Sequence, residues 1–352
     1  MAKATRKGAG GSEPKRATLA DVANLAGLSR TSASMILTGR PDTRLSAEAH
    51  AKVMAAAQQL GYRPNVAARS LRTDRTQTIA FISDVVATTR FASGLIRGAL
   101  HAAEEANHVM LVLETGGEPA REGEAIRAAL DRQVDGIIFA AMRAREIFVP
   151  DLPIQAPVVM LNATSPRFST CVLPDEEQGG KAAVRLLAEV GLGRTIALLG
   201  QSDEAEVGLF RSETVARRVR GIRSEMKRQR LKFVAEESCW NWEPDEGYKL
   251  TRRMFRKNPS IGALLCMNDR LAFGAYQALS ELGLRIPEDV SIVSFDNDEL
   301  ASYLRPGLTT IGLPHERMGE FAVELVLESR DGREHLVPMP IVERQSTREV
   351  GN

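Results

Sequence analysis

Apolar residues between positions 18 and 71 recur at helical spacing and are interrupted by short polar turns. Thr18, followed three residues later by Asp21, is close to a capping box, and Ser29 is suited to cap a second helix. A short turn that contains Gly27 joins these two helices, which is the pattern of a helix-turn-helix, although any helical hairpin shares it. The pattern predicts helices that begin after Thr18, over Arg30–Leu37 and over Ser46–Leu60.

From residue 78 onward the pattern changes to short β-branched runs that alternate with helical stretches of a dozen or more residues. This alternation predicts parallel sheets covered by helices on both faces, and the length favours two α/β lobes over one. The expected strands are Ile79–Ser83, Val109–Leu113, Gly136–Ala140, Val158–Leu161, Thr195–Leu199, Ile261–Cys266 and Ser291–Phe295. The expected helices are Phe91–Ala106, Ala120–Arg132, Glu176–Val190, Arg211–Lys227, Pro244–Lys257, Asp269–Leu282 and Pro314–Ser329.

Charge separates the two parts of the chain. The net charge is only +1, yet residues 1–76 hold 13 Lys and Arg against 5 Asp and Glu, and the remainder holds 33 against 40. A basic head on an acidic body is typical of a protein that contacts nucleic acid at one end. The hydrophobic fraction of 43% is ordinary for a globular protein, and no apolar run approaches the ~18 residues of a membrane span.

The sequence lacks the patterns of several other classes of protein. Residues 1–16 are basic and Gly-rich without an apolar stretch, so we expect a disordered arm rather than a secretion signal, and a cytoplasmic protein that lies on the nucleoid when bound to DNA. The three cysteines and five histidines are scattered, which predicts free thiols and no metal site. No nucleophile elbow, phosphate loop or catalytic cluster is present, so no catalytic residue or cofactor is expected.

Four motifs of the head lie at a fixed spacing: Leu19-x-Asp21-Val22-Ala23, Leu25-Ala26-Gly27-x-Ser29, Leu60-Gly61-Tyr62-x-Pro64-Asn65 and Ala68-Arg69-Ser70-Leu71. They resemble the head and hinge of the LacI/GalR family of bacterial transcriptional regulators. The resemblance implies an all-α helix-turn-helix DNA-binding domain over residues 17–62 and a hinge helix and linker over 63–77. A helix over Val66–Arg72 is too short to be stable alone in water, and by resemblance it folds when two protomers pair on DNA.

The body carries further motifs: Val134-Asp135-Gly136-Ile137-Ile138, Arg218-x-x-Gly221, Asn268-Asp269-x-x-Ala272-x-Gly274-Ala275, and Ile286-Pro287-x-Asp289-Val290-Ser291-Ile292-Val293-x-Phe295-Asp296. They resemble the sugar-binding core of the same regulators, a two-lobed α/β fold like that of type I periplasmic binding proteins. The resemblance implies an effector-binding and dimerisation core over residues 78–352. With crossings near Leu173, Gly312 and Ser329, the first lobe would hold about 78–173 and 313–328, and the second about 174–312 and 329–352.

The resemblance also implies which residues of the head contact DNA. Arg30 can bind guanine and Thr31 a base edge or a thymine methyl group, while hydroxyls such as those of Ser29 and Ser34 suit phosphates. Met35 stands where the family often has Arg, and it can only pack on a methyl group or a sugar. The operator sequences of the family are therefore not expected to apply to this chain. Leu71 would wedge into the minor groove, unless it is an ordinary core leucine. The expected DNA-binding residues are Thr18, Ser29, Arg30, Thr31, Ser34, Met35, Asn65, Ala68 and Leu71.

A second set of residues is expected to bind an effector. Four of them follow predicted strands, where ligands bind in open α/β sheets, and the others fall where the family contacts its effector. Acids accept hydrogen bonds from hydroxyl groups and Arg and Asn donate them, so these types suit a polyol. Core packing of the Trp and salt bridges between the lobes are the alternative interpretations. The set is Asp84, Phe91, Asn162, Arg218, Trp242, Asn268 and Asp296.

The sequence therefore predicts a homodimeric regulator, most simply a repressor, that binds near-palindromic double-stranded operator DNA with an affinity set by a small effector, expected to be a sugar. The C-terminus has no leucine heptads, which favours a dimer over a tetramer. The sequence is also compatible with three alternatives: a sugar-binding protein without a DNA role, a regulator with a corepressor that is not a sugar, and an enzyme built on α/β lobes.

Overall fold

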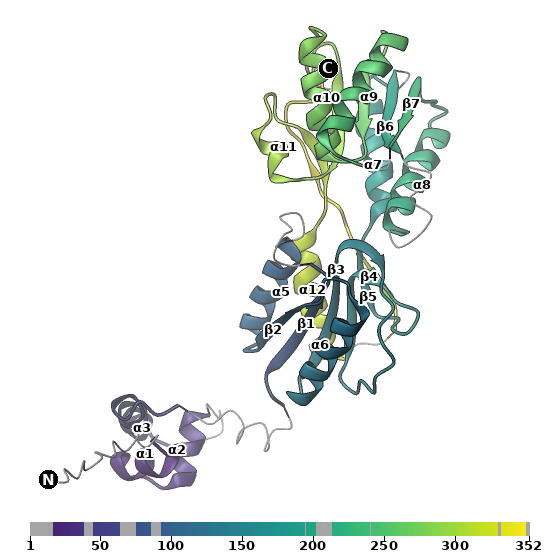
Figure 1. The fold of residues 1–352 in the computed structure, drawn as a ribbon. Coiled ribbons are helices and arrows are strands. Elements are labelled where there is room, and N and C mark those ends of the chain that lie inside the picture. The colour runs from purple at the N-terminus through teal and green to yellow at the C-terminus, as the bar shows by residue number, and fades with distance from the viewer. Residues whose placement is uncertain are drawn as a thin grey trace, which may run out of the picture. The chain divides into compact units, whose positions relative to one another are not determined.

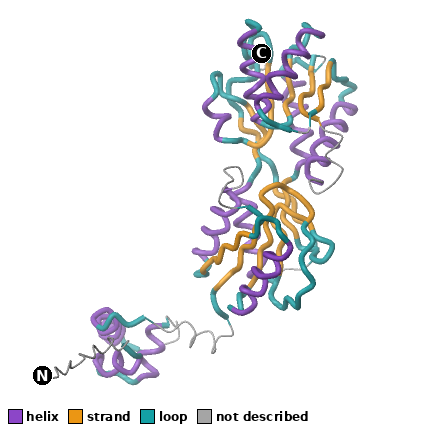
Figure 2. The backbone as a smooth tube through the Cα atoms, viewed as in Figure 1, coloured by secondary structure: helices purple, strands orange, loops and turns teal. Residues whose placement is uncertain are grey.

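A computed structural model describes residues 17–38, 45–63, 75–85, 93–193, 195–201, 213–239, 241–329 and 332–349. The chain divides into two compact units, Met1–Thr76 and Gln77–Asn352. Figure 1 labels the helices of both units and the strands β1 to β7, and Figure 2 shows the secondary structure along the backbone. The arm expected over residues 1–16 and the helix expected over Val66–Arg72 lie outside the described residues.

The first unit contains the three helices that the hydrophobic pattern predicts. They are α1 (Leu19–Ala26), α2 (Arg30–Leu37) and α3 (Ala47–Gln59). One small core joins them, because the apolar stripe of each helix faces the other two. Its buried members are Val22, Ala23, Ala26, Ala33, Ile36, Val53, Ala56 and Ala57.

Side-chain caps fix where these helices begin. Thr18 and Asp21 form a reciprocal capping box, in which the Asp21 Oδ2 atom accepts from the Thr18 backbone N–H at 2.8 Å. Ser29 accepts from the N–H of Ser32 at 3.0 Å, and Ser46 caps α3 in the same way. Gly27 ends α1 with a φ of 68°, a left-handed conformation that glycine adopts without a steric penalty. The turn between α1 and α2 is therefore set by local sequence.

The second unit contains two six-stranded sheets. The first has the strand order β11-β5-β4-β3-β1-β2, and all its neighbours are parallel. Its elements are β1 (Thr78–Ser83), α5 (Ser93–Glu105), β2 (Val109–Glu114), α6 (Pro119–Asp131), β3 (Gly136–Glu146), β4 (Val158–Thr164), β5 (Cys171–Pro174), α12 (His315–Glu328) and β11 (Glu334–Val337). Helices α5 and α12 cover one face of this sheet and α6 covers the other.

Glycine permits an unusually close contact between α5 and α12. A Cβ atom on Gly98 would lie 1.9 Å from the carbonyl oxygen of Glu316, and one on Gly319 would lie 2.1 Å from that of Leu95. Since no side chain fits at these two positions, the helix backbones touch directly. This contact ties α12, which lies late in the sequence, to the first lobe.

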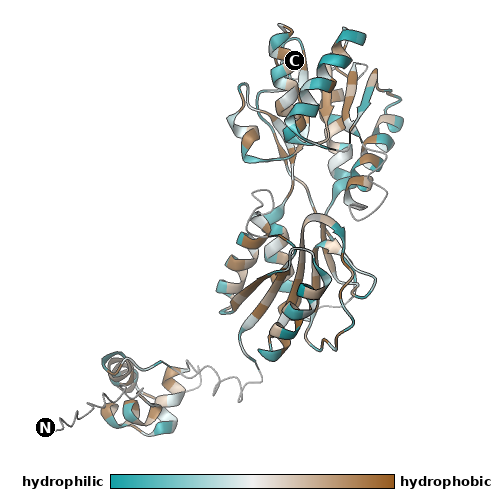
Figure 3. Ribbon diagram, in the orientation of Figure 1, coloured by the Kyte–Doolittle hydropathy of each residue, from teal (hydrophilic) through white to brown (hydrophobic). Residues whose placement is uncertain are grey.

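The second sheet has the order β12-β10-β9-β8-β6-β7, in which only the pair β10 and β12 is antiparallel. Its inner strands β10, β9, β8 and β6 are buried, and its helices carry their polar faces outward, as Figure 3 shows by hydropathy. The elements are α7 (Glu176–Glu189), β6 (Ile196–Gln201), α8 (Glu213–Arg228), β7 (Ala235–Ser238), α9 (Pro244–Lys257), β8 (Ala263–Cys266), α10 (Asp269–Glu281), β9 (Ser291–Asp296), α11 (Glu299–Tyr303), β10 (Thr309–Gly312) and β12 (Ile341–Val342).

Three segments connect the two lobes: β5 leads into α7, β10 leads into α12, and β11 leads into β12. The expected third crossing near Ser329 is wrong. Strand β11 pairs in parallel with β5, for example Leu336 with Leu173, so the chain stays in the first lobe through Val337. Four residues with only one fully buried side chain carry too little hydrophobic pattern to be recognised as a strand. All three connections leave the carboxyl ends of strands, which brings the carboxyl edges of both sheets to the lobe junction.

Candidate functional site

The second helix of the head presents its N-terminal end to solvent. Arg30 and Thr31 are exposed at the start of α2, whereas Ala33 and Ile36 on its other face are buried. Thr18 and Ser29 are exposed but use their hydroxyl oxygens as helix caps. Ser34 and Met35 are half-buried. The expected hinge residues Asn65, Ala68 and Leu71 lie outside the described residues.

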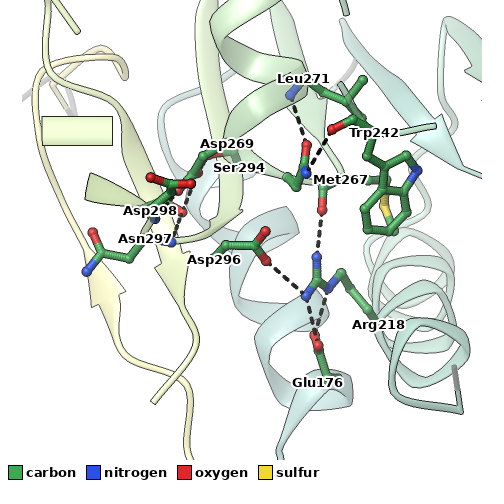
Figure 4. Close-up of polar contacts among 12 residues, drawn as sticks. Glu176, Arg218, Trp242, Met267, Asp269, Leu271, Ser294, Asp296, Asn297 and Asp298 are labelled. Atoms are coloured by element: carbon green, nitrogen blue, oxygen red, sulfur yellow. Dashed lines mark hydrogen bonds and ion pairs between the residues drawn. The ribbon is translucent and has the colours of Figure 1, made fainter. Parts of the chain in front are cut away.

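Arg218 is the centre of the polar network in the second lobe (Figure 4). It lies on α8 and is 2% exposed. Its Nε and Nη2 atoms donate to the two carboxylate oxygens of Glu176 at 2.7 and 2.8 Å, and its Nη1 atom donates to the carbonyl of Met267 at 2.6 Å. Nη2 also lies 3.4 Å from the carboxyl of Asp296, and the guanidinium stacks on the ring of Phe295. The network thus joins the start of α7 to the ends of β8 and β9.

The ionisation of this network follows from its burial. Burial opposes the charge on Arg218, but the two neighbouring acids more than compensate, so its pKa is raised. Burial also raises the pKa of Asp296 to about 8, although Arg218 acts in the opposite direction. Arg218 therefore stays charged and is neutralised mainly by Glu176.

Asp296 and the residue after it have strained backbones. Asp296 has a φ of 107° and Asn297 a φ of 56°, values that residues with a side chain rarely adopt. Buried Asp269 supports this turn, because its Oδ2 atom accepts from the N–H of Asp298 at 2.7 Å and its Oδ1 atom accepts from Thr310 at 2.8 Å. Burial raises the pKa of Asp269 to about 6. Strain of this kind is concentrated at functional sites, where the surrounding structure holds it in place.

Asn268 and Trp242 lie beside the same network. Asn268 caps α10, since its Oδ1 atom accepts from the N–H of Leu271 at 2.8 Å, and its Nδ2 atom donates to the carbonyl of Trp242 at 3.2 Å. The indole of Trp242 donates to the carbonyl of Cys239 and packs against the core of the second lobe. Four of the expected effector residues, Arg218, Trp242, Asn268 and Asp296, are thus brought together.

Two of the three residues expected in the first lobe, Asp84 and Asn162, bind the backbone of β3. The Oδ1 atom of Asp84 accepts from the N–H of Met142 at 3.1 Å, and the Nδ2 atom of Asn162 donates to the carbonyl of Ala141 at 2.9 Å. Asn162 is buried and has a φ of 51°. The Oδ2 atom of Asp84 accepts from the Nε atom of Arg145 at 3.3 Å. Phe91 lies outside the described residues.

Three charged residues at the carboxyl edges were not predicted: Glu176, Arg145 and Glu122. Glu176 directly follows the first segment that crosses between the lobes, and that position is the feature of the sequence that could have indicated its role. Glu122 falls on the apolar stripe of a helix, where an acid is unexpected. Arg145 lies beyond a bulge in β3, which separates the pairing of Ala140 from that of Arg145, and no sequence pattern marks it.

Among the described residues, an ion pair joins the two lobes. Arg217 on α8 donates from both terminal nitrogens to the two carboxylate oxygens of Glu334 on β11, each at 2.7 Å. Beside this pair lies a cavity of about 320 Å³. Its lining includes Glu176 but none of the expected effector residues. The cavity is lined by Asp175, Glu176, Glu177, Gln178, Arg217, Arg220, Glu334 and Leu336.

Within the part of the chain that the structure describes, no group of three His, Cys, Asp or Glu side chains is arranged to hold a metal ion. The same described residues include no helix that is both long and apolar enough to cross a bilayer.

Comparison with known proteins gives consistent matches. Residues 18–65 match the model of the bacterial regulatory proteins of the lacI family, and residues 184–347 match that of a periplasmic binding protein-like domain. The chain is 31% identical to the HTH-type transcriptional repressor PurR of Vibrio vulnificus (strain CMCP6), over 91% of this chain and 93% of that protein. It is 29% identical to the ribose operon repressor of Escherichia coli (strain K12), over 94% and 96%.

A solved structure of similar fold is that of the lac repressor dimer bound to operator and the anti-inducer ONPF. Its TM-score is 0.72 at 25% identity, and the match covers 95% of this chain and 99% of the other. The expected combination of a helix-turn-helix head with a two-lobed α/β core is therefore confirmed.

Proposed function

Because the chain belongs to the lacI family of bacterial regulatory proteins, we propose that it is a dimeric repressor. In this proposal its affinity for an operator is set by a small ligand bound between the two lobes. The observation that carries this proposal is that one chain combines two features. Its capped helix α2 exposes Arg30 and Thr31, and the polar carboxyl edges of its two sheets meet at the lobe junction. The repressor would act in the cytoplasm on the nucleoid, and we assign it no catalytic step.

The head reads DNA with the N-terminal end of α2. Arg30 donates a pair of hydrogen bonds to guanine, Thr31 contacts the neighbouring base, and Met35 packs on a methyl group. Thr18, Ser29 and Ser34 hold the phosphates, which fix position rather than sequence. One head reads one half-site, so a near-palindromic operator needs two protomers.

The hinge completes the DNA contact in this proposal, on the basis of sequence alone. Asn65 caps a short helix, Ala68 allows its partner to approach closely, and Leu71 opens a base step of the minor groove. Unstacking one step costs about a few kcal/mol, which the new helix contact and the bent DNA offset. A helix this short does not persist without its partner, so its formation depends on how the two cores are placed.

The ligand is a sugar in this proposal. In the second lobe Arg218, Asn268 and Asp296 supply hydrogen bonds and Trp242 supplies a ring face, while Asp84, Asn162 and Phe91 act from the first lobe. Sites of this kind place a few polar groups in an otherwise apolar surface. The ion pair of Arg217 and Glu334 joins the two lobes, and it supports a model in which the lobes close together on the ligand.

The coupling between ligand and DNA must be reciprocal: a ligand that weakens DNA binding is itself bound more weakly by the DNA complex, by the same factor. The test is fluorescence anisotropy of the full chain on a duplex selected from a random pool, titrated with neutral sugars and purine bases. We expect at least one sugar to change the operator affinity. If several sugars bind and none changes it, the switch is refuted, and a response to purines alone would favour a corepressor that is not a sugar.

A sugar-binding protein without a DNA role is the second candidate function. The body alone favours it, whereas the exposed, capped α2 does not. Failure of the full chain to enrich any duplex from the pool, together with sugar binding, would establish this alternative.

A further inference from the structure

The residues that directly precede β1, β2 and β3 form a polar cluster at the amino edge of the first sheet. They are Gln77, His108 and Asp135, and their strands are neighbours in the order β3-β1-β2. The candidate effector residues lie at the carboxyl edges of the sheets, so this amino-edge cluster is on the opposite side of the lobe. It also lies where the chain passes from the first unit, which ends at Thr76, into the second. The proposed function assigns no role to any of the three residues.

Gln77 is held on both sides of its Cα atom. Its N–H donates to the Oδ2 atom of Asp135 at 2.8 Å, and its carbonyl accepts from the N–H of Val109 at 2.8 Å. The backbone between these two bonds has a φ of 53°, in the left-handed region that residues with a side chain rarely adopt. Such a conformation persists only where the surrounding structure fixes it, and it is concentrated at functional positions. The two bonds therefore fix the backbone at the first residue of the second unit.

Asp135 is itself fixed by the backbone and by a buried histidine. Its N–H donates to the carbonyl of Thr78 at 2.7 Å. Its Oδ2 atom lies 3.3 Å from the Nε2 atom of His108, and the side chains of His108 and Asp135 are only 8% and 10% exposed. The Nδ1 atom of His108 lies 2.8 Å from the carbonyl of Ala106, which can only accept, so Nδ1 carries a proton. A second proton between Nε2 and Oδ2 makes the His108–Asp135 contact attractive, because two lone pairs would otherwise face each other.

We propose that Asp135, held by His108, positions the chain segment that leads to the head by fixing the backbone at Gln77. This inference rests on the proposed function, because it assigns the amino-edge cluster a part in operator binding. Gln77 is bonded to the first residue of β2 and to the residue before β3, so it moves with the first sheet as one body. A displacement of that sheet is then passed to the segment without an intervening flexible residue.

The size of the effect follows from the freedom that the two bonds remove. Fixing the backbone of one residue costs a free energy that corresponds to a change of about five- to thirtyfold in an equilibrium constant. When the core has already fixed Gln77, operator binding does not bear that cost. A chain in which Gln77 is free has to fix it on the DNA, so its operator affinity is lower by a factor in this range.

The experiment compares Gln77→Gly, Asp135→Ala and Asp135→Asn with the matched control Asn107→Gly, all in the full chain. Asn107 is exposed beside His108 and has a φ of 55°, but its N–H donates to Glu104 of its own helix. Both glycine variants relieve a left-handed backbone while adding freedom, so each should change the melting temperature by less than about 2 °C. The two variants thus differ in their contact with the linker and not in their effect on the fold.

Operator binding is measured by fluorescence anisotropy on the selected duplex. Gln77→Gly and Asp135→Ala should weaken it at least about fivefold, and Asn107→Gly should leave it unchanged. Asp135→Asn keeps an oxygen that accepts from the N–H of Gln77, and its amide can donate to His108. We therefore expect it to bind within about twofold of the wild type.

A second measurement needs no DNA. Trypsin can cleave after Arg75, which is exposed, and mass spectrometry quantifies the fragment that begins at Thr76. Asp135→Ala should raise the initial rate of this cleavage at least about threefold, because the backbone at Gln77 then opens locally more often. Asp135→Asn and Asn107→Gly should be cleaved as the wild type is.

Several results would overturn the proposal. Wild-type operator binding by Gln77→Gly would mean that the amino-edge cluster only stabilises the sheet, and equal losses in Gln77→Gly and Asn107→Gly would attribute the effect to glycine at this edge. Cleavage of Asp135→Ala at the wild-type rate, or an Asp135→Asn variant as weak as Asp135→Ala, would reject the hydrogen bond to Gln77 as the cause. If the wild type selects no duplex, the proposed function fails, whereas the cleavage rates still test the hold on Gln77.

Discussion

Replacing Glu176 should destabilise the second lobe strongly, because Glu176 is the main partner of buried Arg218. Glu176→Gln keeps the shape and one acceptor oxygen but removes the charge opposite the guanidinium of Arg218, whose side chain is 3% exposed. Breaking a buried ion pair on one side costs about 3 to 5 kcal/mol, because an uncompensated charge remains. Loss of the Glu176 charge favours ionisation of Asp296, 3.4 Å from Nη2, which then supplies part of the lost countercharge. We therefore expect the free energy of unfolding to fall by about 3 kcal/mol, at the low end of that range.

The matched control is Glu177→Gln, one residue along α7. Glu177 pairs with Lys181 at 2.7 Å, but its side chain is 43% exposed. An exposed pair four residues apart on a helix contributes about 0.3 to 0.5 kcal/mol, so this variant should unfold almost as the wild type does.

Urea unfolding followed by circular dichroism measures both variants, provided that the slope with denaturant is unchanged. The double variant Glu176→Gln with Arg218→Met adds a second test. Removing both charges should restore part of the stability lost in Glu176→Gln, because no buried charge is then left alone. The reasoning is refuted if Glu176→Gln and Glu177→Gln are equally stable, or if the double variant is less stable than Glu176→Gln.

Three further predictions concern the head, the hinge and pH. Arg30→Ala should weaken operator binding by about 1–3 kcal/mol and relax the preference at one base pair; equal losses in anisotropy on operator and random DNA would show that Arg30 contacts only phosphate. Leu71→Ala should reduce DNA bending in circular permutation gels, and an unchanged bend would reject the wedge. The folded-state pKa of Asp296 is raised to about 8, so the folded state holds a proton that the unfolded state loses above about pH 4, and the stability contribution of this group falls as pH rises from about 4 to 8. Asp296→Asn should therefore lose less stability than the wild type between pH 5 and 8 in urea unfolding, and parallel profiles would contradict this assignment.

The sequence predicted those parts of the fold that local chemistry determines. The capping hydroxyls of Thr18, Ser29 and Ser46 marked helix starts that the structure confirms. The α9 helix was predicted at its observed ends, Pro244 and Lys257, because Pro and the charged last turn delimit it. Long buried strands were recognised from their β-branched runs.

Short edge strands could not be predicted in the same way. Strand β7 alternates half-buried and exposed residues around Glu236 and Glu237, and β11 includes exposed Glu334. Such strands exist because a neighbour supplies hydrogen bonds, and not because their own residues favour a strand. The lobe boundary near Ser329 was misplaced for this reason.

The candidate site was predictable as a set of positions and not as a network. Arg218 and Asp296 were both expected, but no pattern indicated that Glu176 would occupy two donors of Arg218. Likewise Asp84 was expected, whereas its contact with Arg145 depends on a bulge in β3. Pairing across strands and helices far apart in the chain is set by packing, which a single sequence does not display.

The triple crossing between the lobes has a consequence for synthesis. The first sheet acquires its edge strand only at Glu334–Val337, and the second only at Ile341–Val342. The head is complete by Gln59, so at ribosomal speeds of 5–20 residues per second it waits roughly 15 to 60 seconds for either lobe to be finished. A chain interrupted anywhere in that interval would carry a complete DNA head beside two incomplete lobes. Premature termination would therefore remove control of the head without removing the head itself.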